Sequence, residues 1–257
     1  MVANLQIALV QANLAWEQPE VNRTHLKELV LKAAQADVYV LPEMFTTGFT
    51  MNAESYAETL QGATIEWMQG LAAERGAAIC GSFICTEDNN YYNRFVFVTA
   101  EGVLANYDKR HTFTLAGEEK VFTKGNVPTI VTYKGWKLCL QVCYDLRFPV
   151  WARNTVGYDV LLYCANWPVK RIAAWDALLK ARAIENMSYC VGVNRVGNDG
   201  NEIPYNGHSA VYDTLGDQMT FSEATETVLV VSLSYEAQQQ ARMRFKFLQD
   251  ADEFTIL

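Results

Sequence analysis

The chain contains 257 residues, half of them hydrophobic, with 21 basic and 29 acidic side chains that give a formal net charge of −8. Such an acidic chain is repelled by phosphate backbones and by anionic lipid, so we expect neither a nucleic acid nor a membrane as a partner. A chain of this length can bury a large core, and mixed helix–strand chains of this size often form one domain. We therefore expect a single domain over residues 1–257.

No apolar run is long enough to span a membrane, and the first residues, MVANLQIALVQANL, lack the basic start and the apolar core of a secretion signal. The six cysteines are Cys80, Cys85, Cys139, Cys143, Cys164 and Cys190. Most of them lie inside apolar runs and none forms a C-x-x-C pair, which indicates free thiols in a reducing compartment. We expect a soluble, cytoplasmic protein.

The first half of the chain predicts alternating strands and helices. Leu26, Leu29, Val30 and Ala33 recur with the spacing of an amphipathic helix. Later in this half, three strands follow one another with short turns, which indicates antiparallel pairing. The predicted strands are 4–10, 38–41, 77–85, 91–99 and 103–107, and the predicted helices lie around 26–33 and 65–75.

In the second half, Lys134-Gly135 is typical of a tight hairpin turn between two strands. The polar loop from Asp108 to Asn126 is long for a compact domain, and loops of this length are commonly functional. The predicted strands are 129–133, 136–142, 160–164, 189–193, 209–212 and 228–233, and the predicted helices are 150–154, 172–186 and one from Tyr235. The alternation implies sheets that are covered by helices, and thus an α/β fold.

One thiol lies where an apolar strand runs out into a polar turn, in the segment KLCLQVCYDLRFP. Cysteine is usually a small buried core residue, so burial is the default interpretation of any one of the six. Cys143 differs because it ends the strand face opposite to the apolar one and polar residues follow it directly. We expect this thiol to meet solvent, to have its pKa lowered by a nearby cation, and to be a nucleophile.

An acid and an amine are presented in the same way. Glu43 follows the apolar run DVYVLP, and the apolar residues after it suit it to general-base chemistry, although a glutamate is most often a surface carboxylate. Lys109 comes just past another strand, in a charged cluster that would more commonly be a solvated face. Beside a carboxylate and a thiol, its ammonium would stabilise the oxyanion formed when an amide is attacked.

A histidine is a rival partner for the thiol, because many thiol hydrolases activate cysteine with an imidazole. His111 is the candidate, whereas His25 is expected to be exposed on a helix and His208 to be structural. No His or Cys spacing resembles a metal site and no glycine-rich phosphate loop is present, so we expect no metal and no cofactor.

The blocks LPEMFTTGF, YDKRHTF and QVCYDLRFP resemble, in this order, the three signature blocks of the nitrilase superfamily of carbon–nitrogen hydrolases. Further blocks, YYNRFVFVTAEG, ARAIENMSYCVGVNRVG and NGHSAVYDTLGD, extend the resemblance over nearly the whole chain. It implies a catalytic triad of Glu43, Lys109 and Cys143. A second supporting glutamate would be Glu118 rather than its neighbour Glu119.

The resemblance also implies an α-β-β-α sandwich that dimerises into a longer stacked sandwich, with residues 238–257 crossing onto the partner. The residues after Glu43 and Cys143 are most similar to those of omega-amidases, which release ammonia from 2-oxo dicarboxylic acid monoamides such as 2-oxoglutaramate and 2-oxosuccinamate. The backbone N–H of Tyr144 would assist Lys109 at the oxyanion, and Tyr144 and Trp167 would wall the pocket.

A dianionic product implies a cation for the distal carboxylate. Arg147 is the first candidate, with Lys170 or Arg171 as substitutes, and an ion pair of Arg147 with Asp145 or another carboxylate is the structural alternative. Other amidases of the superfamily, acting on deaminated glutathione, on an N-carbamoyl amine or on a nitrile, remain alternative functions. A noncatalytic scaffold that retains the fold is a further alternative.

Overall fold

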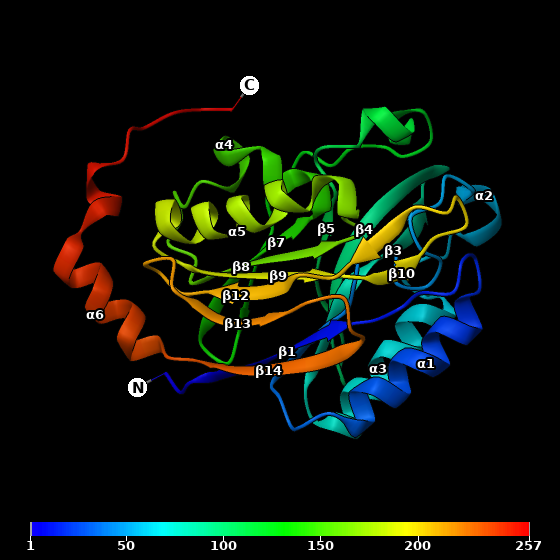
Figure 1. Ribbon diagram of the computed structural model, residues 1–257, viewed down its shortest axis with the longest axis horizontal. Helices are drawn as coiled ribbons and strands as arrows, with labels where there is room; N and C mark the ends of the chain where they lie inside the picture. Colours follow the sequence, from blue (N-terminus) through cyan, green and yellow to red (C-terminus); the bar gives the residue numbers. More distant parts are fainter. Residues whose placement is uncertain (1, 257) are drawn as a thin grey trace.

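The computed structural model describes residues 2–256 and shows two six-stranded sheets packed face to face, with helices on both outer surfaces (Figure 1). The predicted α-β-β-α sandwich is confirmed. The strands of the first sheet are β1 (Leu5–Gln11), β2 (Val38–Val40), β3 (Ala78–Glu87), β4 (Asn90–Thr99), β5 (Gly102–Asp108) and β14 (Thr227–Leu233), in the order β14-β1-β2-β3-β4-β5.

The first sheet mixes parallel and antiparallel pairing. Strands β1, β2 and β3 are parallel to one another, whereas β3, β4 and β5 form the antiparallel succession that the sequence predicts. The last strand, β14, pairs antiparallel with the first strand, β1, from Leu5↔Leu233 to Gln11↔Thr227. The carboxyl ends of β2 and β5 therefore lie at the same edge of the sheet.

The strands of the second sheet are β6 (Ile130–Tyr133), β7 (Trp136–Val142), β8 (Val160–Ala165), β9 (Tyr189–Asn194), β12 (Ser209–Tyr212) and β13 (Gln218–Ser222), in the order β13-β12-β9-β8-β7-β6. The three central strands β7, β8 and β9 are parallel. The hairpin between β6 and β7 turns at Lys134 and Gly135, whose φ angles are 49° and 84°. Two consecutive positive φ angles are those of the tight hairpin turn predicted for this pair.

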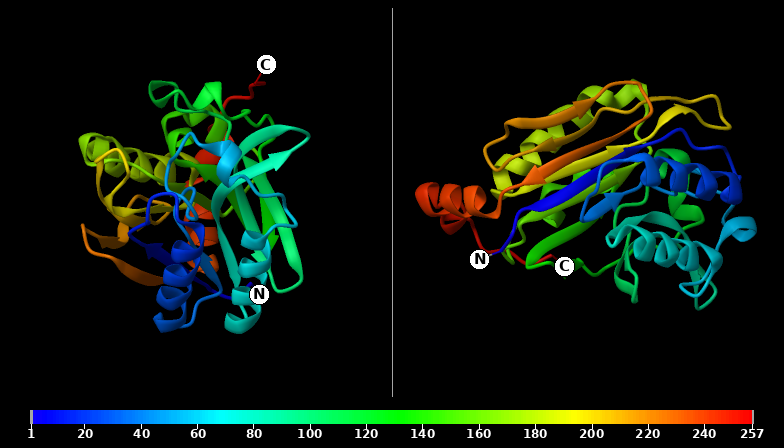
Figure 2. Two further views of the ribbon diagram at one scale, coloured as in Figure 1. Left: turned by 90° about the vertical axis from the view of Figure 1, so that its right-hand side faces the viewer. Right: turned by 90° about the horizontal axis from the view of Figure 1, so that it is seen from below.

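Each sheet is apolar on both faces because one face meets the other sheet and the opposite face meets helices. Along β1, Ile7 and Leu9 belong to the core between the sheets, whereas Ala8 and Val10 belong to the core beneath the helices of the first sheet. The helices are α1 (Pro19–Lys32), α2 (Ala53–Tyr56), α3 (Ala63–Arg75), α4 (Pro149–Ala152), α5 (Ile172–Asn186) and α6 (Tyr235–Phe245). Figure 2 shows α1 and α3 on one side of the paired sheets and α5 on the other.

Three short elements escape the sequence patterns: α2, β13, and a hairpin of β10 (Val196–Asn198) and β11 (Pro204–Asn206). Each strand of this hairpin has only three residues, and Asn, Gly and Asp dominate the segment between them, so neither periodicity nor β propensity identifies it. Strand β13 is similarly hidden, because its exposed polar residues pair with β12 only at the edge of the sheet.

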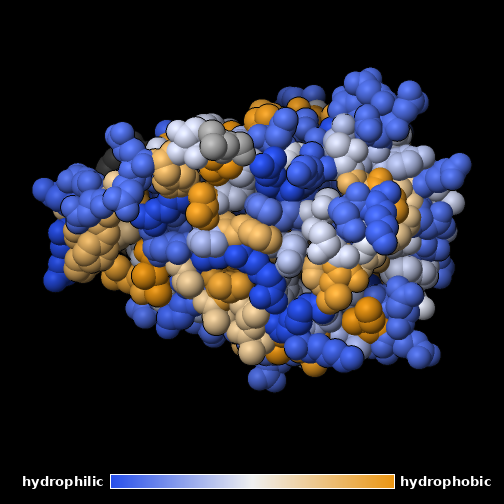
Figure 3. All heavy atoms as spheres, turned by 90° about the horizontal axis from the view of Figure 1, so that it is seen from above, coloured by the Kyte–Doolittle hydropathy of each residue, from blue (hydrophilic) through white to orange (hydrophobic). Residues whose placement is uncertain are grey.

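The C-terminal part extends from one end of the molecule as α6 and then returns over the outer face of the second sheet. There Phe254 and Ile256, with Val150 and Trp151, line a cavity of about 570 Å³. Figure 3 shows this face from above, with apolar side chains interspersed among charged ones. Val150, Phe254 and Ile256 are exposed on it.

Candidate active site

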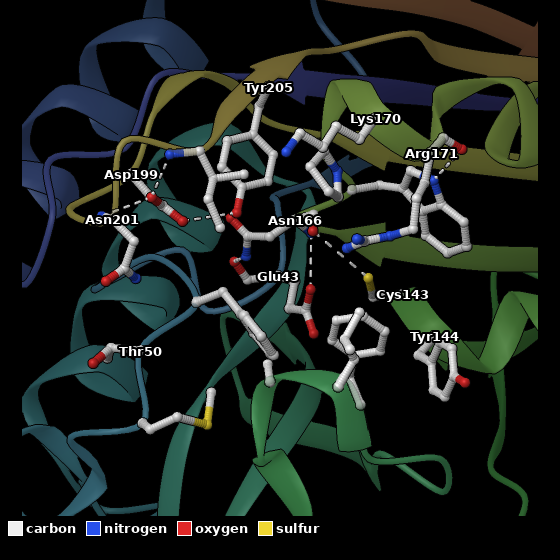
Figure 4. A pocket seen from close by; sticks show the side chains of 18 of the residues that line it. Glu43, Thr50, Cys143, Tyr144, Asn166, Lys170, Arg171, Asp199, Asn201 and Tyr205 are labelled. Carbon is white, nitrogen blue, oxygen red and sulfur yellow. Dashed lines mark hydrogen bonds between the residues drawn. The ribbon is translucent and has the colours of Figure 1, made fainter.

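Four polar side chains follow the carboxyl ends of strands in both sheets. Glu43 lies three residues after β2, Lys109 directly after β5, Cys143 directly after β7, and Asn166 directly after β8. Because these strand ends meet at one edge of the stacked sheets, residues far apart in sequence are brought together. Figure 4 shows Glu43, Cys143 and Asn166 converging on one cavity.

The amine and two carboxylates form a closed ionic cluster. Lys109 Nζ lies 2.8 Å from Glu43 Oε1 and donates to both oxygens of Glu118, at 3.0 and 2.9 Å. Lys109 is 1% exposed and both glutamates are fully buried. Glu119, the neighbour of Glu118, is exposed to solvent, so of the two adjacent glutamates Glu118 is the one placed beside Lys109.

The balance of charges keeps the ammonium protonated. Burial by itself lowers the pKa of Lys109, but the carboxylates of Glu118 and Glu43 outweigh it and hold that pKa well above the ordinary value. For Glu118, burial raises the pKa, the nearby Lys109 lowers it, and the negative charge of Glu43 raises it, with a net increase. The cluster thus holds two carboxylates and one ammonium, and all three side chains are buried.

Cys143 occupies a strained turn. Its φ angle is +44°, in the left-handed region that non-glycine residues seldom adopt, and it begins the short 3₁₀ helix η3 (Cys143–Arg147). The buried Asp145 holds this turn: its Oδ2 accepts hydrogen bonds from the N–H of Val142 at 3.0 Å and from the hydroxyl of Tyr107 at 2.8 Å. Tyr107 lies only two residues before Lys109. The carboxylate of Asp145 therefore links the loop that carries the thiol to the loop that carries the amine.

The expectation that the pKa of the Cys143 thiol is lowered is wrong. The residue is 9% exposed, and burial together with the negative charge of Glu43 raises the pKa of Cys143 well above its ordinary value, although Lys109 opposes this. The thiol donates to the carbonyl oxygen of Asn166, with 3.9 Å between sulfur and oxygen, and Glu43 lies near enough for its charge to act on the thiol. At neutral pH the sulfur therefore keeps its proton until a base removes it.

The thiol opens into a cavity of about 950 Å³. The predicted pocket residues Tyr144, Arg147 and Trp167 all line it, as do Lys170 and Arg171. The guanidinium carbon of Arg147 lies 4.9 Å from the centroid of the Trp167 ring.

The two arginines of the cavity have different neighbours. Arg147 forms no ion pair within residues 2–256, so the alternative pairing with Asp145 or another carboxylate is wrong. The guanidinium of Arg171 lies over the ring of Phe113, 4.8 Å from its centroid.

Two asparagines beside the cluster were not identified from the sequence. The N–H of Asn166 donates to Glu43 Oε2 at 2.8 Å, and its side-chain amide donates to the carbonyl oxygen of Glu43 at 2.6 Å. Asn93, on β4, donates from Nδ2 to Glu43 Oε1 at 2.8 Å and to Glu118 Oε1 at 3.2 Å. A polar amide within or directly after an apolar strand is the only local signal that marks either residue.

None of the histidines lines the cavity. The ring of His111 lies 2.7 Å from Asp145 through Nδ1 and stacks on Phe148 at 3.8 Å between ring centroids. His208 bonds Asp176, and His25 is partly exposed beside Glu226. The structure therefore does not bring an imidazole into the position that a thiol–histidine pair requires.

The six cysteines are all free and buried. Over residues 2–256, no helix is both long and apolar enough to cross a bilayer, and no group of His, Cys, Asp and Glu side chains is placed to hold a metal ion.

A sandwich of two stacked sheets that carries an acid, an amine and a thiol at one edge is the arrangement of a hydrolase acting on carbon–nitrogen bonds. Residues 6–243 match the model of the carbon-nitrogen hydrolase family, and the chain belongs to this family. It is a hydrolase of carbon–nitrogen bonds other than peptide bonds, in linear amides.

Relatives of known structure or curated activity match this chain over nearly its full length. The chain is 42% identical over 257 residues to an omega-amidase of Yersinia enterocolitica, covering all of both proteins. It is 31% identical to a 2-oxoglutaramate amidase of Bacillus subtilis (strain 168), covering 93% of each. A crystal structure of a carbon–nitrogen hydrolase superfamily protein from Xanthomonas campestris, with an arsenic adduct in the active site, is 40% identical, with a TM-score of 0.96 over 99% of this chain and all of that one.

Proposed function

We propose that this protein is an omega-amidase that hydrolyses the terminal amide of 2-oxo dicarboxylic acid monoamides, such as 2-oxoglutaramate and 2-oxosuccinamate, to the 2-oxo acid and ammonia. The observation that carries the proposal is the convergence of the buried side chains of Cys143, Glu43 and Lys109 on one cavity that also holds free cationic side chains. The omega-amidase relatives support this choice of substrate.

In the first half-reaction, Glu43 accepts the thiol proton and the thiolate of Cys143 attacks the carbonyl carbon of the amide. The oxyanion of the tetrahedral intermediate is held by the ammonium of Lys109 and the backbone N–H of Tyr144. Glu43 then returns the proton to the leaving nitrogen, the carbon–nitrogen bond breaks, and ammonia departs from a thioester.

In the second half-reaction, Glu43 takes a proton from water, which attacks the thioester carbonyl at the same oxyanion site. The carbon–sulfur bond breaks, the 2-oxo acid leaves, and the proton on Glu43 restores the thiol of Cys143. Glu118 keeps Lys109 charged and fixed throughout, since it accepts two of the hydrogen bonds of the ammonium. All proton transfers run through groups of the chain itself, the substrate and water.

Arg147 is proposed to bind the distal carboxylate of the substrate. It lies four residues beyond the nucleophile, lines the same cavity and has no carboxylate partner within residues 2–256. A guanidinium held against an aromatic face presents its N–H groups in a plane, which suits bidentate binding of a carboxylate. Lys170 and Arg171 are the substitutes for this role.

The test is ammonia release by the purified protein from 2-oxoglutaramate, with 2-oxosuccinamate, an N-carbamoyl amine, deaminated glutathione and a nitrile assayed in parallel. We expect the two 2-oxo acid amides to give the highest kcat/KM, and Cys143→Ala to lower it by at least about a thousandfold. A higher kcat/KM for any other compound of the panel would replace the substrate. Undiminished turnover by Cys143→Ala would remove the mechanism.

We also propose that the active protein is a homodimer in the cytoplasm. The exposed Met243 and Phe247, on α6 and just after it, support the first part because they leave apolar surface uncovered in a single chain. Sedimentation of the purified protein at several concentrations tests it, and a species of 29.0 kDa throughout would contradict it.

A further inference from the structure

Asn93 is the member of the buried cluster to which the proposed mechanism gives no task. It lies on β4, is 1% exposed, and its single amide nitrogen reaches both carboxylates that surround Lys109. Its backbone carbonyl oxygen also accepts the N–H of Lys109 at 3.0 Å. One residue therefore touches the base, its neighbouring acid and the backbone of the amine.

The amide of Asn93 has a defined orientation. Its oxygen, Oδ1, is buried and has no hydrogen-bond partner among the described residues, which costs free energy in a folded protein. The reverse orientation would place that oxygen against the carboxylates of Glu43 and Glu118, with no proton between them. The chain thus leaves one acceptor unsatisfied in order to give one N–H to each glutamate.

The hydrogen bond from Asn93 makes the two carboxylate oxygens of Glu43 unequal. Oε1 accepts from Lys109 and from Asn93, whereas Oε2 accepts only the N–H of Asn166. A carboxylate oxygen with two donors has no free lone pair in a good direction, while one with a single donor retains one. The oxygen left to take a proton from Cys143 is therefore Oε2.

We propose that Asn93 is a positioning residue of the hydrolytic reaction: it turns the Glu43 carboxylate so that Oε2 receives the thiol proton. The inference builds on the hydrolytic mechanism proposed above and is independent of which amide is the substrate. Asn93 acts through Glu43 and does not touch the reacting carbon.

The charged and titratable groups near Glu43 come from four elements. Lys109 follows β5, Glu118 begins the 3₁₀ helix η2 (Glu118–Lys120), Cys143 begins η3, and Cys164 lies on β8. Of these four groups, Lys109 alone is a cation. Removal of the neutral N–H donor of Asn93 therefore leaves the negative charge of the site less well compensated. The acid limb of the pH profile should then move to higher pH, because a site with excess negative charge takes up protons more readily.

The test compares the pH profiles of kcat/KM for Asn93→Ala, for the isosteric Asn93→Asp and for wild type. We expect kcat to fall about tenfold or more in both variants, KM to change little, and the acid limb to move to higher pH, further for the aspartate because it adds a carboxylate. Asn90→Ala, on the exposed start of the same strand, is the matched control and should superimpose on wild type.

The rate of Cys143 alkylation by iodoacetamide, followed by intact mass over the same pH range, gives a second reading that requires no substrate. Failure of wild type to hydrolyse 2-oxoglutaramate would thus end the substrate proposal and leave this one open to test. An acid limb at the wild-type pH in a folded Asn93→Ala or Asn93→Asp protein, in both turnover and alkylation, would show that Asn93 is only structural and overturn the inference. The aspartate variant keeps the test available if the alanine variant does not fold.

Discussion

For Cys143, the sequence predicts the position of the side chain in the fold but not its neighbours. The end of an apolar strand followed by YDLRFP correctly indicates a thiol at the edge of a sheet. It cannot reveal that Glu43 is near the sulfur, because that carboxylate is a hundred positions away in the chain and follows a strand of the other sheet. Burial of the sulfur and the negative charge of Glu43 give the pKa of the thiol the direction opposite to the one expected from a cation alone.

The asparagines of the site were missed for a related reason. Asn93 and Asn166 bond Glu43 across 50 and 123 positions of the chain. An asparagine has no charge and a weak local preference, so its sequence context does not distinguish a buried amide that orients a base from one that ends a strand. Only the folded structure distinguishes these two cases.

The first prediction at this scale concerns the base. Because the pKa of the Cys143 thiol is raised, the sulfur depends on Glu43 for its deprotonation, and Glu43→Gln should lower kcat by about a hundredfold to ten-thousandfold. Glu119→Gln, which alters an exposed glutamate beside Glu118, is the matched control and should retain wild-type kcat. A Glu43→Gln enzyme with more than half of the wild-type rate would contradict the assignment of the base.

The second prediction concerns the distal carboxylate of the substrate. Arg147→Ala should raise KM for 2-oxoglutaramate by about 10- to 100-fold, because a charge-assisted hydrogen bond is lost, with a smaller effect on a neutral aliphatic amide. Arg147→Lys should recover part of the loss. Arg171→Ala is the comparison, and a larger effect there than at Arg147 would transfer the role to Arg171.

At the scale of elements, the sequence predicts the long strands better than the short segments that complete the cavity. Lys134-Gly135 has a turn preference strong enough to fix a hairpin by itself. The hairpin of β10 and β11 is held instead by distant contacts. Tyr205 on β11 bonds Asp199 between the two strands, and the φ of +81° at Gly197 is accompanied by close approach to Asn13.

The loop that carries Lys109 and Glu118 depends on a close approach at Gly125. A Cβ atom there would lie 2.1 Å from the carbonyl oxygen of Asp108, and the N–H of Gly125 bonds the carbonyl oxygen of Lys109 at 2.9 Å. Gly125→Ala should therefore displace Lys109, lower kcat by about tenfold or more, and cost about 1–3 kcal/mol of stability. Ammonia release and thermal unfolding measure the two effects.

Gly70 is the matched control for Gly125→Ala, because it has space for a Cβ atom. It is exposed on α3, and a Cβ atom there would meet nothing within 4 Å. Gly70→Ala should stabilise the protein by about 0.5–1 kcal/mol and leave kcat unchanged. Equal losses of activity in Gly125→Ala and Gly70→Ala would show that the loop is not the sensitive element.

At the scale of the whole molecule, the buried thiols make the free energy of unfolding depend on pH in the alkaline range. Burial raises the pKa of Cys139 from 9.0 to about 12 and that of Cys85 from 9.0 to about 11. Below pH 9 both thiols are neutral in the folded and the unfolded chain, so their contribution is fully present. Above it the unfolded chain releases protons that the folded chain retains, and the contribution is lost.

The free energy of unfolding should thus fall from about pH 9 upward, with Cys139 alone contributing a slope of about 1.4 kcal/mol per pH unit between about pH 9 and 12. Urea unfolding at a series of alkaline pH values measures this slope. In Cys139→Val the slope should be shallower by the share of one proton. An identical slope in the two proteins would show that this thiol is not responsible.

The pairing of β14 with β1 has a consequence for synthesis on the ribosome. The whole second sheet lies between β5 and β14 in the chain, so the edge of β1 stays unpaired until residues 227–233 have left the exit tunnel. Glu43, Lys109 and Glu118 emerge long before the sulfur that they serve. A nascent chain that ends before residue 227 therefore already carries these side chains, but on a first sheet in which one edge of β1 is still unpaired.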